Sequence, residues 1–510
     1  MKLGSFFHRT LLVAGVLFSA CKEVKRDPNI VIILADDLGY GDPQVYNSES
    51  KIPTPHIDAL ANEGMRFSDA HSPSSVCSPT RYGLLTGRYA WRTELKRSVL
   101  WMWDKPLILT DRLTFPKMLK TKNYATACIG KWHLGWRWPS NQGEGYMNDT
   151  IPIGDWNFKA RNELWKSIDI LKPLGGGPLE AGFDYYFGDD VPNFAPYTFF
   201  ENNKLVKIPN LIKPGDMYGG PGPMSEGWDL TQVMPEITKW AVKYIEDQSK
   251  KDHPFFLYFT LTAPHTPIAP MDEFKGKSEA GLYGDFVNEV DWSVGQIIEV
   301  LKKTGEFENT LLVFTSDNGS PQRDGTNMGG AIASVKKYGH DPSRPWRGMK
   351  SDAWEGGHRV PFIATWPKEI PASTESNQLI CHTDIISTVA KILSIKNEKK
   401  SMEDSYDISS VLLGKNVGNP IRESIVHHSG DGTFAIRKGN WKLILGNNSG
   451  GFSNNLKIEG IPVDTDGQLY SLATDPSEQK NLYSEHTEKV KELTELLDQY
   501  KKDGYSNRKP

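Results

Sequence analysis

The sequence predicts an α/β protein with a large, mostly parallel central sheet that is flanked by helices. Its 510 residues, 38% of them apolar, are enough for a sizeable core. Short apolar runs alternate with segments of helical periodicity, a pattern typical of parallel sheets whose strands are buried on both faces. Two of these runs end directly in acidic side chains, at the strand ends where such sheets place their sites.

The expected strands are continuous apolar runs bounded by turn residues. They are residues 29–37, 125–130, 255–261, 310–316 and 360–366.

Three helices of the same region have recognisable ends. The first begins at Thr54-Pro55, an N-cap followed by a first-turn proline, and Gly64 ends it. The second follows Cys77, from Pro79 to near Gly87. The third, residues 283–303, has valine, isoleucine and leucine at helical spacing.

Two segments depart from this alternation and divide the chain. Residues 140–225 are rich in Gly, Pro, Asn and Trp, which predicts a loop-rich insertion over one end of the sheet. After about residue 425 a hairpin, a strand and a final helix are expected. We therefore predict a main domain of residues 29–425 and a smaller C-terminal α/β subdomain of residues 426–510.

The N-terminus reads as an export signal. Basic residues precede an apolar stretch, residues 11–20, that is too short to span a bilayer. The sequence Leu-Phe-Ser-Ala-Cys at 17–21 is typical of a bacterial lipobox, so residues 1–20 would be removed, Cys21 lipidated and residues 21–28 left as a tether. The alternative is an ordinary signal peptide. The lipobox places the protein in the outer membrane or on the cell surface, with the periplasm as the alternative.

Charge and cysteine content exclude other classes. A net charge of −4 leaves no basic surface for nucleic acid. Four cysteines do not make a disulfide scaffold, and a Cys128–Cys381 pair is the one bridge that we leave open.

Oxygen donors follow two of the predicted strands. Asp36-Asp37 and Asp317-Asn318 each come at the end of an apolar run. Adjacent carboxylates repel each other unless a cation neutralises them, and oxygen donors suit calcium before magnesium. The sequence therefore predicts a site for one calcium ion at this rim.

Cys77 opens the pentapeptide Cys77-Ser-Pro-Thr-Arg81, with Leu-Thr-Gly-Arg at 85–88. This pattern resembles the signature of the formylglycine-dependent (type I) sulfatases of the alkaline phosphatase superfamily, and of bacterial polysaccharide sulfatase lipoproteins in particular. Taken alone, a buried structural cysteine would be the alternative. In that family the cysteine is oxidised to an aldehyde, and one hydroxyl of its hydrate is the nucleophile. The resemblance thus implies a maturation partner, a formylglycine-generating or anaerobic sulfatase-maturing enzyme.

Further motifs carry the resemblance across residues 28–485. They are L-A-D-D-x-G-Y-G-D at 34–42, G-K-W-H-x-G at 130–135, A-P-H-T-P at 263–267, T-S-D-N-G at 315–319, R-G-x-K at 347–350 and E-G-G-x-R-V-P at 355–361.

The resemblance also implies a role for each matched residue. Lys131 and Lys350 would bind sulfate, His265 would bind the substrate and protonate the leaving alcohol, and His133, expected beside Lys131 on an extended segment, would accept a proton. Arg81 would position the hydrated aldehyde. The implied metal ligands are Asp36, Asp37, Asp317, Asn318 and the modified Cys77, with Asp317 also the base for the attacking hydroxyl.

The expected activity is the removal of sulfate from a sulfated polysaccharide or oligosaccharide, either algal, such as ulvan or carrageenan, or a glycosaminoglycan. Two alternatives are a phosphatase or phosphonate hydrolase of the same superfamily and a non-catalytic glycan-binding lipoprotein. Aromatic, arginine and histidine side chains are the candidates for sugar contacts. They are Trp91, Arg92, Trp101, Trp103, His340, Arg344 and His358.

Overall fold

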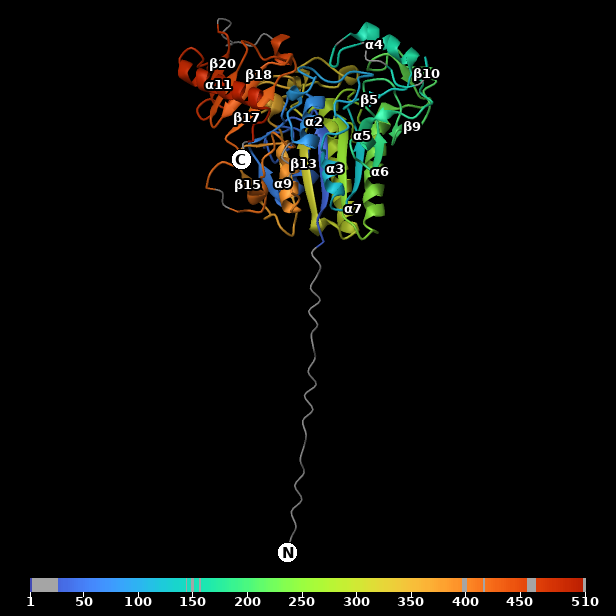
Figure 1. The fold of residues 1–510 in the computed structure, drawn as a ribbon, viewed down its shortest axis with the longest axis horizontal. Helices are drawn as coiled ribbons and strands as arrows, with labels where there is room; N and C mark the ends of the chain where they lie inside the picture. The colour runs from blue at the N-terminus through green and yellow to red at the C-terminus, as the bar shows by residue number, and fades with distance from the viewer. Residues whose placement is uncertain are drawn as a thin grey trace.

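A ten-stranded mixed sheet organises the described part of the chain (Figure 1). The structure is a computed structural model, and it describes residue 1 and residues 26–507, apart from residues 144, 148–150, 156, 397–400, 416–417 and 456–464. The predicted signal peptide and the lipidation site at Cys21 lie outside the described residues.

The centre of this sheet is parallel, as predicted. Five adjacent strands, in the order β13-β1-β12-β4-β7, run in the same direction. Antiparallel pairs join β14 to β13 on one side and β8 to β7 on the other. In spatial order the strands are β15 (Thr374–Ser376), β2 (Met65–Phe67), β14 (Phe362–Thr365), β13 (Thr310–Ser316), β1 (Asn29–Asp36), β12 (Phe255–Pro264), β4 (Ala125–Gly130), β7 (Tyr185–Gly188), β8 (Phe200–Glu201) and β9 (Lys204–Leu205).

Helices cover both faces of the sheet, because alternate residues of its central strands are apolar on either side. On β1, Val31 and Ile33 belong to the core under one helical layer, whereas Ile32 and Leu34 belong to the core under the other. The first layer holds α1 (Pro55–Asn62), α6 (Val233–Gln248) and α7 (Gly281–Lys303). The second holds α2 (Cys77–Thr86), α3 (Phe115–Lys120) and α9 (Asp384–Ile392).

Residues 140–225 hold short elements joined by long loops, and they also supply β7, β8 and β9 to the main sheet. The sequence pattern did not indicate these strands, because each is four residues or fewer in a glycine- and proline-rich context. The remaining elements here and elsewhere in the main domain are β3 (Ala70–His71), β5 (Trp136–Arg137), α4 (Phe158–Leu164), β6 (Gly175–Gly176), α5 (Gly177–Glu180), β10 (Leu211–Ile212), β11 (Pro223–Met224), α8 (Glu355–His358), β16 (Ile380–Cys381) and α10 (Ser409–Leu412).

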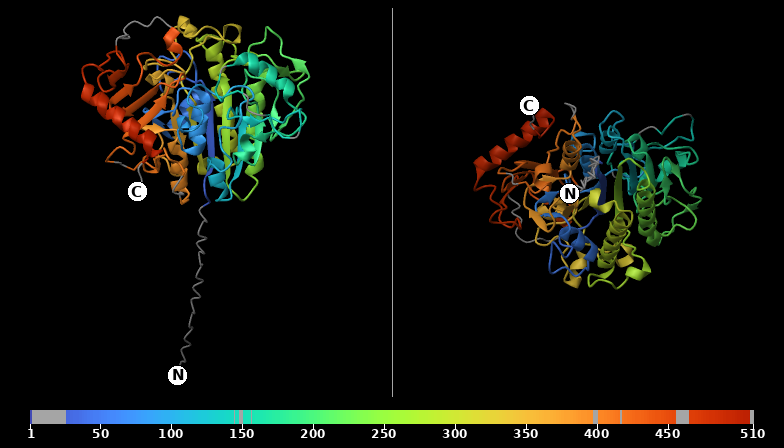
Figure 2. Two further views of the ribbon diagram at one scale, coloured as in Figure 1. Left: turned by 45° about the horizontal axis from the view of Figure 1, so that its top comes forward. Right: turned by 90° about the horizontal axis from the view of Figure 1, so that it is seen from below.

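The C-terminal part folds onto a separate four-stranded antiparallel sheet. Its strands are β17 (Ser424–His428), β18 (Phe434–Lys438), β19 (Trp441–Ile444) and β20 (Gln468–Ser471). Helix α11 (Thr487–Asp503) packs Leu493 and Leu497 against this sheet and lies at the outer edge of the molecule (Figure 2).

Two further findings concern membrane-spanning helices and disulfide bonds. In the residues that the structure describes, no helix is both long and apolar enough to cross a bilayer. Cys77, Cys128 and Cys381 are each free and buried, so a Cys128–Cys381 bridge is not formed.

Candidate active site

Four neighbouring strands deliver charged side chains to one rim of the sheet. Asp36 ends β1, Lys131 follows β4, His265 follows β12 and Asp317 follows β13. These strands are adjacent and parallel, so their carboxyl ends meet at the same edge. Residues up to 281 positions apart are thereby brought together.

Helix α2 supplies the cysteine. It begins at Cys77 itself, two residues before the predicted start, after an extended Val76, and it ends at a left-handed Gly87 (φ 64°). Arg81 lies one helical turn after Cys77, on the same face. Both side chains are buried, and both point to the strand rim, where the Cys77 sulfur lies 3.7 Å from Asp36 Oδ1.

Three cations hold the carboxylates of this rim. The guanidinium of Arg81 donates to Asp317 Oδ2 at 2.8 Å and lies 3.5 Å from Asp36 Oδ1. The Lys131 ammonium lies 2.6 Å from Asp36 Oδ2.

Lys350 closes the rim from the opposite side. Its ammonium lies 2.6 Å from Asp37 Oδ1 and 3.5 Å from the Cys77 sulfur. Lys131 and Lys350 therefore flank the position where Cys77 would act, although they come from segments more than 200 residues apart.

The charge state of this cluster follows from burial and pairing. Burial raises the pKa of the Cys77 thiol to about 12, against the opposing effect of the two lysines, so the thiol is protonated at neutral pH. Burial lowers the pKa of Lys131 and Lys350, but the adjacent carboxylates Asp36 and Asp37 outweigh it and the net shift is upward. Both lysines therefore remain cationic.

His133 presents a free ring nitrogen to the site. Its Nε2 lies 2.8 Å from the carbonyl oxygen of Leu100 and donates to it, so Nδ1 carries the lone pair. No described residue bonds Nδ1. Burial and the charge of Lys131 hold the His133 pKa well below its usual range. The backbone here is left-handed (φ 53°), so the predicted extended segment is wrong at this residue.

His265 has a similar arrangement. Its Nδ1 donates to the carbonyl of Thr266 at 2.5 Å, and its Nε2 lies 3.7 Å from Asp37 Oδ2. Burial and the charge of Lys350 hold the His265 pKa well below its usual range, so the free imidazole is neutral.

The donor set at the rim fits a hard cation. Asp36, Asp37, Asp317 and Asn318 are at most 1% exposed, and the amide oxygen of Asn318 has no hydrogen-bond partner among the described residues. An unpaired buried oxygen is costly unless a ligand completes it. Ligand atoms of Asp36, Asp37, Cys77 and His265 lie within 4.8 Å of one another. Asp317 and Asn318 each hydrogen-bond Asp37, so the predicted metal ligands lie together at this rim, with His265 beside them.

A cavity of about 580 Å³ opens above this cluster. Cys77, His133, His265 and Lys350 line it and are buried, whereas Arg97 and Asp155 are among the lining residues that are exposed. Both the segment 140–225 and the C-terminal subdomain contribute to its wall, which the sequence pattern did not indicate. The lining residues that sequence reasoning missed include Arg97, Asn193, Phe194, Tyr218, Arg323, Asp431, Phe452 and Asn454.

Most of the predicted sugar-contacting residues lie elsewhere in the fold. Of these seven, only Trp101 lines this cavity. Arg92 lies over the ring of the buried Trp91 and pairs with Asp404. His340 bonds Asp42, Arg344 pairs with Glu49 on the surface, and His358 belongs to a buried cluster.

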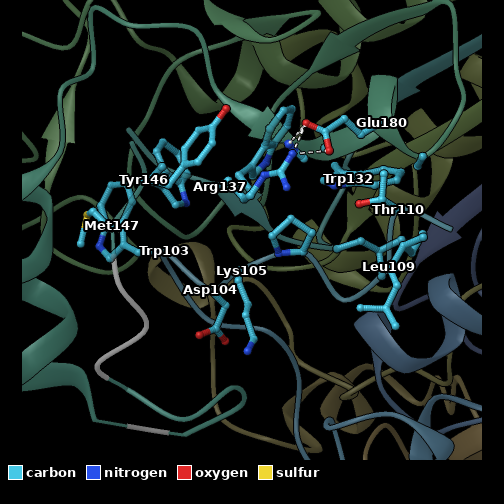
Figure 3. Close-up of a pocket in the computed structure, with 18 of the residues that line it drawn as sticks. Trp103, Asp104, Lys105, Leu109, Thr110, Trp132, Arg137, Tyr146, Met147 and Glu180 are labelled. Carbon is cyan, nitrogen blue, oxygen red and sulfur yellow. Dashed lines mark hydrogen bonds and ion pairs between the residues drawn. The ribbon is translucent and has the colours of Figure 1, made fainter. Parts of the chain in front are cut away.

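Trp103 instead lines a second cavity, of about 260 Å³ (Figure 3). Its walls include Trp132 and Leu134, which flank His133 in the chain, so this cavity lies behind the segment that carries His133. The ion pair between Arg137 and Glu180 lies at its edge.

Hydrogen bonds link His71 and His358 in the buried cluster, whereas Nε2 of the third histidine, His427, has no partner among the described residues. Lys442 Nζ lies 3.1 Å from His358 Nε2, and an ammonium can only donate, so His358 Nδ1 carries the ring proton. That proton is donated to His71 Nδ1 at 3.0 Å, and His71 Nε2 donates to Asp69 at 2.9 Å. Both ring nitrogens of His71 and of His358 are engaged in this chain, so neither histidine offers a free lone pair to a metal ion, although three histidines converge there.

The fold and the rim define a hydrolase of the alkaline-phosphatase-like α/β class. Residues 28–395 match the model of the Sulfatase family. The N-acetylgalactosamine-6-O-sulfatase of Bacteroides thetaiotaomicron is 33% identical over 520 positions, which cover 96% of this chain and 98% of that protein. The dog (Canis lupus familiaris) N-acetylgalactosamine-6-sulfatase is 30% identical over 447 positions, covering 85% of this chain and 74% of that protein.

Structural comparison agrees. A solved structure from work on the metabolism of multiple glycosaminoglycans by B. thetaiotaomicron has a TM-score of 0.79 and 31% identity, covering 94% of this chain and 100% of that chain. The chain therefore belongs to the sulfatase family, and it is a type I sulfatase, a sulfuric ester hydrolase.

Proposed function

We propose that this sulfatase removes the 6-O-sulfate of N-acetylgalactosamine in a sulfated glycan, with a formylglycine formed from Cys77 and one bound calcium ion. One observation carries the proposal: the Cys77 side chain lies in a buried rim of oxygen donors between two cationic lysines, at the base of an open cavity. Ammonium groups donate charged hydrogen bonds to the oxygens of a tetrahedral anion, so these lysines suit a sulfate at this position.

Conversion of Cys77 explains how a buried thiol can serve this site. A thiol with a pKa of about 12 is not a thiolate at neutral pH and is a poor nucleophile. The hydrated aldehyde of formylglycine would supply a hydroxyl in its place. Burial and the neighbouring Asp36 raise the pKa of Asp317, which suits that carboxylate to accept the hydroxyl proton.

The two histidines divide the remaining proton transfers. His133 is neutral and its unpartnered Nδ1 can accept a proton, the role of a general base. His265 can donate from Nε2 to the leaving alcohol once it is protonated. The charge of Lys350 disfavours that protonation in the free enzyme, and a bound sulfate would offset this charge.

The buried oxygen donors are suited to calcium, because Asp36, Asp37, Asp317 and Asn318 offer carboxylate and amide oxygens in one place. When bound, the ion would supply positive charge beside the sulfate oxygens. The bound ion would give the Asn318 amide oxygen a ligand contact, which matters most for this atom because it has no hydrogen-bond partner among the described residues.

Removal of the ion should stop turnover. Treatment with a chelator is expected to lower kcat by about 100-fold or more, because cationic stabilisation of charge is worth several kcal/mol. Calcium should restore the rate more fully than magnesium.

Calcium should also raise the Tm of the chelated protein, since a ligand that binds only the folded state stabilises it. An Asn318→Leu variant should show a smaller rise. An equal Tm with and without calcium would contradict the calcium assignment.

Substrate preference tests the glycan assignment. The similarity of this chain to N-acetylgalactosamine 6-sulfatases supports that sugar over the algal glycans that the sequence also allowed. We expect sulfate release from N-acetylgalactosamine 6-sulfate at least about tenfold faster, in kcat/KM, than from the 4-sulfate, because a misplaced ester loses in-line geometry. Ion chromatography of released sulfate measures this.

Rates on 4-nitrophenyl phosphate and 4-nitrophenyl sulfate test the phosphatase alternative. A 4-nitrophenyl phosphate rate equal to that on 4-nitrophenyl sulfate would favour it. Hydrolysis of aryl sulfate alone, with no release from any N-acetylgalactosamine sulfate, would contradict the sugar assignment but not the sulfatase chemistry.

A further inference from the structure

The cavity above Cys77 carries two arginines that the reaction at the rim does not use. Arg97 is exposed and Arg323 is partly buried, and both line the same cavity as Cys77 and Lys350. In Figure 1 the C-terminal subdomain (orange to red) and the segment 140–225 (cyan to green) lie on opposite sides of α2, and residues from both line the cavity.

Neither arginine has a carboxylate partner within 4 Å among the residues that the structure describes. By contrast, other surface arginines of this chain are paired, as Arg66 is with Glu375 and Arg344 with Glu49. One Nη of Arg323 donates to the carbonyl oxygen of Gly330, which leaves its other N–H groups available.

The acidic side chains of the cavity do not neutralise these arginines. Asp37 is paired with Lys350 at the rim. Asp431 accepts hydrogen bonds from the Ser429 hydroxyl and the Thr433 amide within its own turn. The remaining carboxylate, Asp155, is exposed and lies more than 4 Å from either guanidinium, because no ion pair joins them.

The backbone holds both arginines beside the cavity. Ser98, next to Arg97, is left-handed (φ 62°), and its amide donates to the carbonyl of Gly430 in the C-terminal subdomain at 2.7 Å. Gln322, next to Arg323, is also left-handed (φ 59°), and its side-chain amide donates to the Ser343 hydroxyl at 2.8 Å. Arg97 and Arg323 therefore lie in segments that hydrogen bonds anchor to the folded protein.

The geometry points to a second anion-binding subsite. Under the proposed function Lys131 and Lys350 would bind the sulfate at the reacting position, so Arg97 and Arg323 are left for another group. A guanidinium binds carboxylates and sulfates through paired N–H donors. We propose that Arg97 and Arg323 bind a further anionic group of the substrate, the carboxylate of a neighbouring uronate or a second sulfate ester. This inference rests on the proposed function, because it assigns the outer part of the same site.

The test compares substrates that carry one or two anionic groups. N-acetylgalactosamine 6-sulfate has one. N-acetylgalactosamine 4,6-disulfate adds a sulfate, and the 6-sulfated chondroitin disaccharide adds a uronate carboxylate. Arg97→Gln, Arg323→Gln and the double variant are compared with Arg344→Gln, which removes an exposed arginine outside the cavity.

Each cavity variant should raise KM about tenfold on the substrate whose second anion it binds, since a charged hydrogen bond is worth about 1.4 kcal/mol or more. Kinetic constants on the one-anion substrate and on 4-nitrophenyl sulfate should not change. The two-anion substrate whose KM rises, either the disulfate or the disaccharide, identifies the second anion. Equal changes on one-anion and two-anion substrates, or none on either, would overturn the proposal.

A separate measurement keeps this test independent of the sugar assignment. Unsulfated chondroitin disaccharide should inhibit hydrolysis of 4-nitrophenyl sulfate by the wild-type enzyme, and inhibition should weaken about tenfold in the double variant. Should the enzyme release no sulfate from any N-acetylgalactosamine substrate, the proposed function fails, and the subsite is then judged on inhibition by this disaccharide and by N-acetylgalactosamine 4,6-disulfate. Absence of inhibition by both compounds in the wild type would then overturn the subsite too.

Discussion

Replacement of Cys77 by serine is expected to abolish turnover, with kcat falling at least about 10⁴-fold, as it does when an enzymatic nucleophile is removed. An unoxidised serine retains one hydroxyl and lacks the second hydroxyl that would release sulfate. Intact mass should show the thiol-to-aldehyde change in the wild type purified from a host with the maturation enzyme. It should show one added sulfate in the serine variant after incubation with substrate.

The control for this prediction is a second buried cysteine. Cys381→Ala removes an equally buried free thiol on β16, away from the rim, and should leave the rate of 4-nitrophenyl sulfate hydrolysis unchanged. Thermal unfolding of both variants shows whether each is folded. Full activity in Cys77→Ser, or wild-type mass with an intact thiol and full activity, would refute the formylglycine assignment.

The inner part of this site could be predicted from sequence because strand direction places it. Asp36 and Asp317 each follow an apolar run, and the carboxyl ends of parallel strands must meet at one edge. The short motif around Cys77 then identifies the helix that joins them. Local patterns sufficed here, since each signal lies within a few residues of the side chain that it predicts.

The outer part of the site could not be predicted, because it is assembled from segments without local signals. Arg97 and Asp431 meet the same cavity only because the amide of Ser98 bonds Gly430, more than 330 positions away. Short strands such as β7 join the sheet through contacts between residues that are distant in sequence. Such strands have no hydrophobic periodicity from which they could be predicted.

Charged residues were the other source of error. Arg92, His340 and His358 were predicted to contact the sugar, which requires side chains that reach the cavity. Each is instead held inside the protein by a partner that is distant in sequence: Arg92 by Asp404, and His340 by Asp42. Folding alone brings the partners of such buried ion pairs together, so the local sequence does not indicate them.

The largest stability effect is expected at the junction between the main domain and the C-terminal subdomain. The fully buried ammonium of Lys442, on β19, lies 3.0 Å from Glu355 Oε1 and 2.8 Å from Glu478 Oε1. Lys442→Met would leave Glu478 without its cation in the interior, whereas Glu355 would keep its pair with Arg359. We expect a loss of about 3–5 kcal/mol in the free energy of unfolding, measured by urea denaturation.

Lys438 on the neighbouring strand β18 provides the matched control. Its pair with Glu492 is about 40% exposed on both sides, so Lys438→Met should cost less than about 1 kcal/mol. A Lys442→Met loss no larger than that of Lys438→Met would contradict the prediction. Lys442→Met combined with Glu478→Gln should recover part of the loss, because one stranded carboxylate is then removed.

The pH dependence of the Lys442→Met loss separates stranded charge from lost packing. Burial and the nearby Glu355 raise the pKa of Glu478 even with Lys442 in place, and removal of the ammonium raises it further. Between the unfolded and folded pKa values the folded state holds a proton that the unfolded state does not, so acid favours folding. The loss should therefore be smaller at about pH 5 than at about pH 8, whereas a pure packing defect would cost the same at both.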